Sequence, residues 1–127
     1  MHNKACPERQ NPDRAYKICD RKSWEQARQN ARYFGSSDDM RDGFIHLSAP
    51  EQVAATLERH FADQDDLLLI GIDVSRLGKA LRWEPSRGGA LFPHLYEPLD
   101  FTAVVSEVPL VRGPDGRYRT PDSLISC

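Results

Sequence analysis

The sequence predicts an α+β fold, in which a small mixed sheet of about five or six strands carries two main helices. Apolar residues recur at helical spacing in two early segments, after residue 20 and after residue 48. Most of the remaining β-type runs come later in the chain. The apolar stretch 67–74 is nearly continuous, which is typical of a strand buried on both faces. This separation of helices from strands favours α+β.

The first strand and the first helix are expected between residues 15 and 31. Ala15–Cys19 alternates β-forming residues, which predicts a strand. Ser23 and Gln26 have the spacing of a capping box, which predicts a helix to about Ala31 with Trp24 on its core face. Residues 33–43 contain glycine, serines and three aspartates. That composition predicts an exposed, mobile loop.

A second strand and helix are expected to follow directly. Gly43–Ser48 predicts a short strand, and Ser48 and Glu51 again have capping-box spacing. Pro50 suits a first helical turn, so a helix is expected to run to about Phe61. Later strands are predicted at 67–74, 81–83 and 102–111, and the 113–116 segment predicts a tight turn.

The expected organisation is a flexible segment 1–13, a single α+β domain 14–111, and a C-terminal extension or loosely docked tail 112–127. No apolar run approaches membrane-spanning length, and the polar N-terminus has no secretory pattern. The three cysteines have no short spacing, which favours a reducing compartment. A net charge of −2 gives no strong nucleic-acid signal. We therefore expect a cytoplasmic protein with no membrane partner.

The segment 81–96 is rich in groups that can bind a ligand. Gly88 and Gly89 predict a turn, and Arg82, Arg87 and His94 flank it as donors suited to phosphate. The residues that would complete the binding surface are Trp83, Phe92 and Tyr96, as a stacking wall, and Glu84. Two plainer interpretations remain open, an irregular loop anchored by its aromatic residues and a surface ion pair of Arg82 with Glu84.

His46 is the other candidate for chemistry. The strand period of two places Phe44, His46 and Ser48 on one face, with Ile45 and Leu47 toward the core. His46 then faces either solvent or a cleft, and a structural histidine bonded to a backbone carbonyl is the alternative. Because the sequence has no phosphate loop, dinucleotide fingerprint, nucleophile elbow or metal-binding helix motif, we expect no metal.

Four segments together resemble a bacterial family, the domain of unknown function family 952; they are 16–18, 42–48, 82–85 and 92–96. The resemblance implies a relation to the ADP-ribosyltransferase-like fold. The same order of elements is similar to the second half of RNA 2'-phosphotransferases, which use a nicotinamide dinucleotide as acceptor. The resemblance implies that His46 and Ser48 border a dinucleotide cleft, with Arg82, Arg87 and His94 facing the phosphates or an acceptor.

Two functions are carried forward from the sequence. In the first, the domain binds a nucleotide, with NAD as a candidate cofactor, or another phosphorylated small molecule, and His46 and His94 act as general acid and base in a group transfer. In the second, the cleft belongs to a noncatalytic ligand-binding or interaction module. The positions of the two histidines distinguish these two functions, since a pocket shared by both rings favours the small-molecule function.

Overall fold

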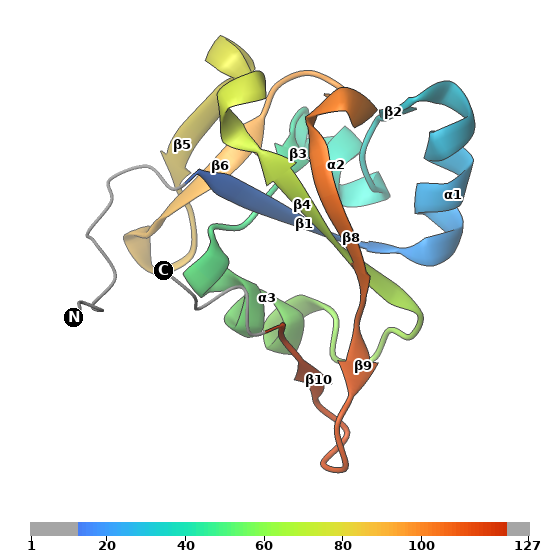
Figure 1. Ribbon diagram of the computed structural model, residues 1–127. Coiled ribbons are helices and arrows are strands. Elements are labelled where there is room, and N and C mark those ends of the chain that lie inside the picture. Colours follow the sequence, from blue (N-terminus) through green and yellow to red (C-terminus); the bar gives the residue numbers. More distant parts are fainter. Residues whose placement is uncertain (1–12, 122–127) are drawn as a thin grey trace, which may run out of the picture.

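A computed structural model describes residues 13–121 and confirms the α+β class (Figure 1). The expected flexible segment 1–13 lies almost entirely outside the described residues, and so do residues 122–127. Within residues 13–121 every strand pair is antiparallel. The expected single mixed sheet is therefore replaced by several small antiparallel sheets.

The three-stranded sheet with the longest strands has the order β1 (Arg14–Asp20), β4 (Leu67–Asp73) and β8 (Val104–Pro109). The expected apolar strand is confirmed, because Leu67–Ile72 is buried throughout. Its central place explains the composition: β4 has a neighbour on each edge and a hydrophobic core against each face.

Successive residues of β4 contact opposite cores. Leu68, Ile70 and Ile72 face a core with Trp24 of α1, which we call the α1-side core. Leu67 and Leu69 face a second core built on α3, with Val53, Leu57, Ile18 and Leu110. The period of two along a strand produces this division.

Helix α1 (Arg21–Asn30) begins three residues earlier than the sequence predicted. Its N-cap is Asp20, whose carboxylate accepts a hydrogen bond of 2.9 Å from the backbone N–H of Ser23. The expected capping role of Ser23 is therefore wrong, since Ser23 supplies the N–H instead of the acceptor. The C-cap of the helix is Ala31, which adopts a left-handed conformation with φ of 57°.

The segment predicted as a mobile loop is instead ordered structure, which corrects the reading of 33–43. It contains part of β2 (Arg32–Tyr33) and a helix that the sequence did not predict, α2 (Ser37–Asp42). Ser36 and Asp39 form a reciprocal capping box, which satisfies the first N–H groups of this short helix. Composition alone suggested a loop because capping residues and loop residues are the same types.

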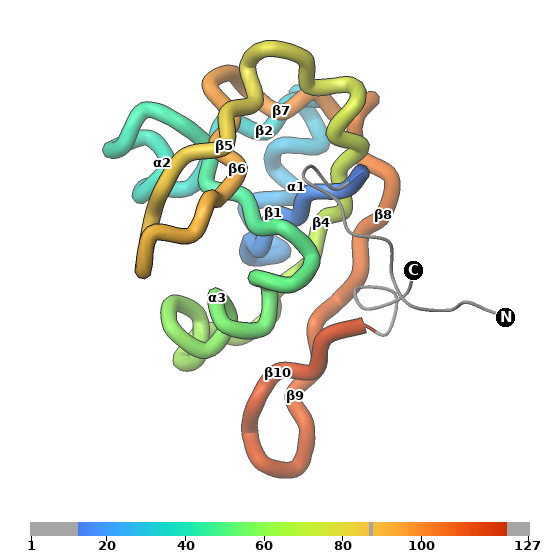
Figure 2. The backbone as a smooth tube through the Cα atoms, turned by 90° about the vertical axis from the view of Figure 1, so that its left-hand side faces the viewer, coloured from blue at the N-terminus to red at the C-terminus, as the bar shows by residue number. Residues whose placement is uncertain are grey.

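A second three-stranded sheet has the order β3 (Ile45–His46), β6 (Leu91–Leu95) and β5 (Leu81–Pro85). The 3-10 turn η4 (Arg87–Gly89) joins β5 to β6, as the glycine pair predicted. The strand expected at 43–48 is shorter than predicted. Beyond it, Ser48 forms an isolated antiparallel bridge to Tyr16 of β1, which brings the two sheets together (Figure 2).

The helix after Ser48 starts differently from the prediction. A 3-10 turn η1 (Pro50–Gln52) leads into α3 (Val53–His60), and the N-cap position of η1 is Ala49. The side chain of Gln52 accepts a hydrogen bond of 2.8 Å from the backbone N–H of Ala49. The expected cap by Ser48 is wrong, because the Ser48 hydroxyl lies instead 3.5 Å from that of Thr56.

The strand predicted at 102–111 starts later in the structure, at Val104, and is interrupted after Pro109. β7 (Leu99–Asp100) pairs with β2, and a 3-10 turn η5 (Phe101–Ala103) precedes β8. Beyond β8 the chain forms a hairpin of β9 (Val111–Arg112) and β10 (Tyr118–Arg119) beside α3 (Figure 1). Arg112 holds it by donating to the carbonyl of Gln64 and to Asp65.

Among the helices of residues 13–121, none has the length and apolar composition that crossing a bilayer requires.

Candidate functional site

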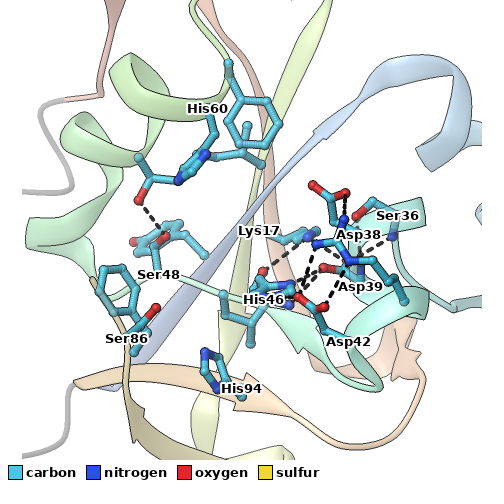
Figure 3. Close-up of a pocket in the computed structure, with 17 residues that line it drawn as sticks. Lys17, Ser36, Asp38, Asp39, Asp42, His46, Ser48, His60, Ser86 and His94 are labelled. Atoms are coloured by element: carbon cyan, nitrogen blue, oxygen red, sulfur yellow. Dashed lines mark hydrogen bonds and ion pairs between the residues drawn. The ribbon is translucent and has the colours of Figure 1, made fainter. Parts of the chain in front are cut away.

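A cavity of about 310 Å³ lies where β1, α2, α3 and the second sheet meet. Figure 3 shows His46, Lys17 and Asp39 on one side of it and Ser48 and His60 on another, with the ring of His94 directed toward the same space. The polar and aromatic residues that line it are Tyr16, Lys17, Ser36, Asp38, Asp39, Arg41, Asp42, His46, Ser48, Thr56, His60, Phe61, Ser86, Phe92 and His94.

His46 and His94 are direct cross-strand partners of β3 and β6. Their ring centroids are 5.6 Å apart, in an edge-to-face arrangement. The sequence predicted one sheet, but β3 and β6 pair with each other in a sheet separate from that of β4. The structure nevertheless brings both histidines to one cavity, and their chemical roles stay predictions.

His46 is fixed from one side by Asp39. The Asp39 carboxylate lies 2.6 Å from Nδ1 of His46 and accepts a hydrogen bond of 3.1 Å from its backbone N–H. A carboxylate on Nδ1 orients an imidazole ring and selects its tautomer, as in hydrolase triads. Asp39 is itself buried, at 2% exposure. We call this pair the Asp39–His46 dyad.

Lys17 explains how a buried carboxylate is tolerated here. It alternates with Ala15 and Cys19 on the face of β1 that is turned to the α1-side core, and only 4% of Lys17 is exposed. Its Nζ donates 2.8 Å to Asp39 and 3.1 Å to the carbonyl of His46. Each buried charge is thus compensated by the other.

The electrostatics of Asp39 follow from these contacts. Burial by itself raises the pKa of the Asp39 carboxyl, but hydrogen bonding from His46 and the charge of Lys17 outweigh it and hold that pKa well below its usual range. Asp39 is therefore ionised at neutral pH and acts as an acceptor only.

Asp42 approaches His46 from the other side. Its Oδ2 lies 3.0 Å from Nε2 of His46, so both ring nitrogens face a carboxylate. A neutral imidazole has one N–H and can donate to only one of them. Arg41 contacts Asp42 and Asp38, and its hydrogen bond is the main cause that lowers the pKa of Asp42.

His94 has its own carboxylate partner. Oε1 of Glu84 lies 2.8 Å from Nδ1 of His94 and accepts a hydrogen bond of 2.7 Å from the Tyr96 hydroxyl. The hydrogen bonds from Tyr96 and His94 lower the pKa of Glu84. Phe44 stacks on the His94 ring at 4.1 Å between centroids. Because Nδ1 is engaged, Nε2 is the nitrogen left for the cavity; we call this pair the Glu84–His94 dyad.

The other site residues predicted from the sequence divide into two groups. Ser48 and Phe92 line the cavity with the histidines. The predicted ligand-binding residues that do not line it are Arg82, Trp83, Glu84 and Tyr96. Arg82 instead lies over the Tyr96 ring, 4.7 Å from its centroid. The side chain of Arg87 falls outside the described part of the structure.

Sequence reasoning missed the residues that support His46. The missed residues include Lys17, Asp39, Arg41 and Asp42, and His60 was missed as a further residue of the cavity lining. A usable signal was present: Ser36 and Asp39 have capping-box spacing between two glycines, which predicts a short helix. Lys17 at an inward position of an alternating strand requires a buried anion as partner.

No group of three or more His, Cys, Asp or Glu side chains within residues 13–121 is arranged to hold a metal ion.

The sequence between residues 18 and 107 matches the model of a family described as protein of unknown function DUF952. The chain belongs to this family. The resemblance noted from its motifs is thereby confirmed, while a relation to ADP-ribosyltransferases is not part of the match. A comparison with curated proteins found no match to this DUF952 chain.

Solved structures of a Caulobacter crescentus protein, CC0527, are similar to this DUF952 chain. The crystal structure is 44% identical with a TM-score of 0.84, covering 88% of this chain and 98% of that protein. A solution NMR structure of CC0527 is also 44% identical, with a TM-score of 0.75 over 84% of this chain and 91% of that one. The similarity covers the fold as a whole, and the names of these structures state no activity.

Proposed function

We propose that this DUF952 protein binds a nucleotide or a related phosphorylated sugar, with NAD as a candidate, and that His46 and His94 act on it as a paired acid and base. The observation that carries the proposal is the pair of carboxylate–histidine dyads that share one cavity. A relation to ADP-ribosyltransferase-like enzymes belongs to the same proposal and rests on motif resemblance.

The dyads suit proton transfer near neutral pH. Imidazole is the side chain whose ordinary titration lies there. A carboxylate on Nδ1 leaves Nε2 of His94 for a substrate, whereas Nε2 of His46 has to exchange its contact with Asp42 for one. In a transfer catalysed by such a pair, one ring accepts the proton of an attacking hydroxyl or water, and the other donates a proton to the leaving group. Ring centroids 5.6 Å apart leave both rings within reach of one small group.

The charges of the cavity indicate which end of the ligand enters it. The lining holds Asp38, Asp39 and Asp42 against Lys17 and Arg41, and these cations are paired with the aspartates. Such a lining disfavours a phosphate and suits sugar hydroxyls, which both donate and accept. We therefore place the sugar in the cavity and the phosphates outside.

The volume supports the same orientation. About 310 Å³ is at the small end of the range of about 300–1,000 Å³ found for ligand sites. A cavity of this size would enclose part of a dinucleotide, and the rest would lie along the surface.

Calorimetric titration tests this function. NAD, ADP-ribose, AMP and ribose 5-phosphate are titrated into the protein, and into His94→Gln and His46→Gln variants. We expect binding at or below millimolar concentration, weakened in both variants by about 0.5–1.5 kcal/mol per lost hydrogen bond. If none of the four compounds binds at millimolar concentration, the interaction-module function replaces this one.

Two arginine variants serve as comparisons in the same titration. Arg82→Ala is expected to leave affinity unchanged, because the Arg82 guanidinium is engaged over the Tyr96 ring. If Arg87 binds the outer phosphates, Arg87→Ala will weaken binding by about 1.5–3 kcal/mol. Loss of affinity in Arg82→Ala would show that the outer phosphates contact Arg82.

A further inference from the structure

One wall of the cavity differs from the others in how it is attached. Helix α2 and its cap supply Ser36, Asp38, Asp39, Arg41 and Asp42 to the lining. The remaining walls come from strands and α3, whose apolar residues belong to the two cores. How α2 is attached therefore determines whether the shape of the cavity is fixed or can change.

No apolar side chain of α2 itself packs against the rest of the protein. From residue 34 to residue 44, Asp39 is the one buried side chain. The apolar side chains before and within the helix point to solvent, with Phe34 53% and Met40 68% exposed, whereas Phe44, beyond the end of the helix, packs on the rings of His46 and His94. Neither Phe34 nor Met40 belongs to the α1-side core or to the second core, which is built on α3.

Polar contacts hold it instead, and most of them converge on His46. Asp39 binds Nδ1 and the backbone N–H of His46, and Asp42 faces Nε2. Lys17 adds the contact from β1. A helix of six residues is not stable by itself in water, so these contacts decide its position.

The segment is also flanked by residues that permit movement. Gly35 has φ of 111° and Gly43 has φ of 87°, and both lie immediately outside the capped helix. Glycine crosses between backbone conformations with little steric barrier, which is a property of hinge positions.

We propose that α2 is a movable wall latched by His46, so that a ligand that engages the His46 ring loosens or replaces the contact with Asp42 and changes the position of α2. The ligand in this statement is that of the proposed function, whereas the latch is a property of the free protein. Nε2 is the atom in question, because Nδ1 stays with the buried Asp39.

Amide hydrogen exchange of the ligand-free protein tests the latch directly. We expect the amides of 37–43 to exchange about tenfold or more faster than those of β4, because they open without global unfolding. Asp42→Asn should accelerate them by a further factor of about three to ten, with β4 unchanged. Asp38→Asn is the matched control, since Asp38 contacts Arg41 but not His46.

The latch is overturned if the α2 amides exchange as slowly as those of β4, or if Asp38→Asn and Asp42→Asn have equal effects. A second arm adds ADP-ribose at millimolar concentration and measures the same amides. If ADP-ribose does not bind, the proposed function fails while the ligand-free result still decides the latch. If it binds and leaves α2 exchange unchanged, the coupling is wrong while the binding function stands.

Discussion

His46 and His94 face each other across β3 and β6, and each ring is held at Nδ1 by a carboxylate from a different part of the chain. Asp39 comes from the preceding helix, and Glu84 from the neighbouring strand. The cavity is therefore lined by histidines of fixed orientation, and this arrangement can be tested without knowing the ligand.

The Glu84–His94 dyad predicts the tautomer of His94. In the neutral ring the proton should lie on Nδ1, because Glu84 accepts it there. Glu84→Ala should remove this preference, as measured by the ¹⁵N chemical shifts of the imidazole. Tyr96→Phe is the control, since it removes the other hydrogen bond to Glu84 and leaves His94 in place. An unchanged tautomer in Glu84→Ala would contradict the dyad.

The buried Lys17–Asp39 pair predicts a large cost for removing one partner. Lys17→Met should lower the free energy of unfolding by about 3–5 kcal/mol, because it leaves an uncompensated buried carboxylate. Urea unfolding measures this. The double variant Lys17→Met/Asp39→Asn should lose less than the sum of the single variants, since the two residues are directly coupled. Arg41→Ala, on the surface of α2, should change stability little; additive single effects would show that the pair is not coupled.

The lowered pKa of Asp39 predicts loss of stability in acid. The folded state binds the Asp39 proton more weakly than the unfolded chain, so its contribution is fully present above the ordinary aspartate pKa of about 3.9. That contribution falls as pH decreases below this value toward the lower pKa of the folded state. Thermal unfolding of wild type and Asp39→Asn between pH 7 and pH 2 measures it. The difference between the two proteins should shrink in acid, and a constant difference would contradict the assignment.

The glycines around α2 predict unequal effects of alanine. Gly35 and Gly43 both have positive φ, so each alanine should cost about 1–2 kcal/mol through the backbone. Gly35→Ala should cost about 1–3 kcal/mol more, because its Cβ would lie 2.7 Å from the Cβ of Asp39, whereas nothing lies within 4 Å of a Cβ at Gly43. Denaturant unfolding of the two variants compares them. Equal losses would show that Asp39 can move away from residue 35.

Local patterns in the sequence determined several features correctly. The continuous apolar run of β4, the glycine turn between β5 and β6, and the alternation around His46 rest on side-chain periodicity and turn chemistry, which neighbouring residues fix. The segments 42–48 and 92–96 likewise identified the family. These signals need no knowledge of which strands pair.

Tertiary structure alone decided the site around those histidines. The pairing of β3 with β6 brings residues 46 and 94 together, and no local pattern specifies that partner. The burial of Lys17 determines that Asp39 turns inward, so a segment with the composition of a loop becomes a helix held by polar contacts to Lys17 and His46. Burial sets the free energy of a charge, and burial depends on the packing of segments distant in sequence. For that reason the sequence identified the two histidines, but not the carboxylates and the lysine that orient them.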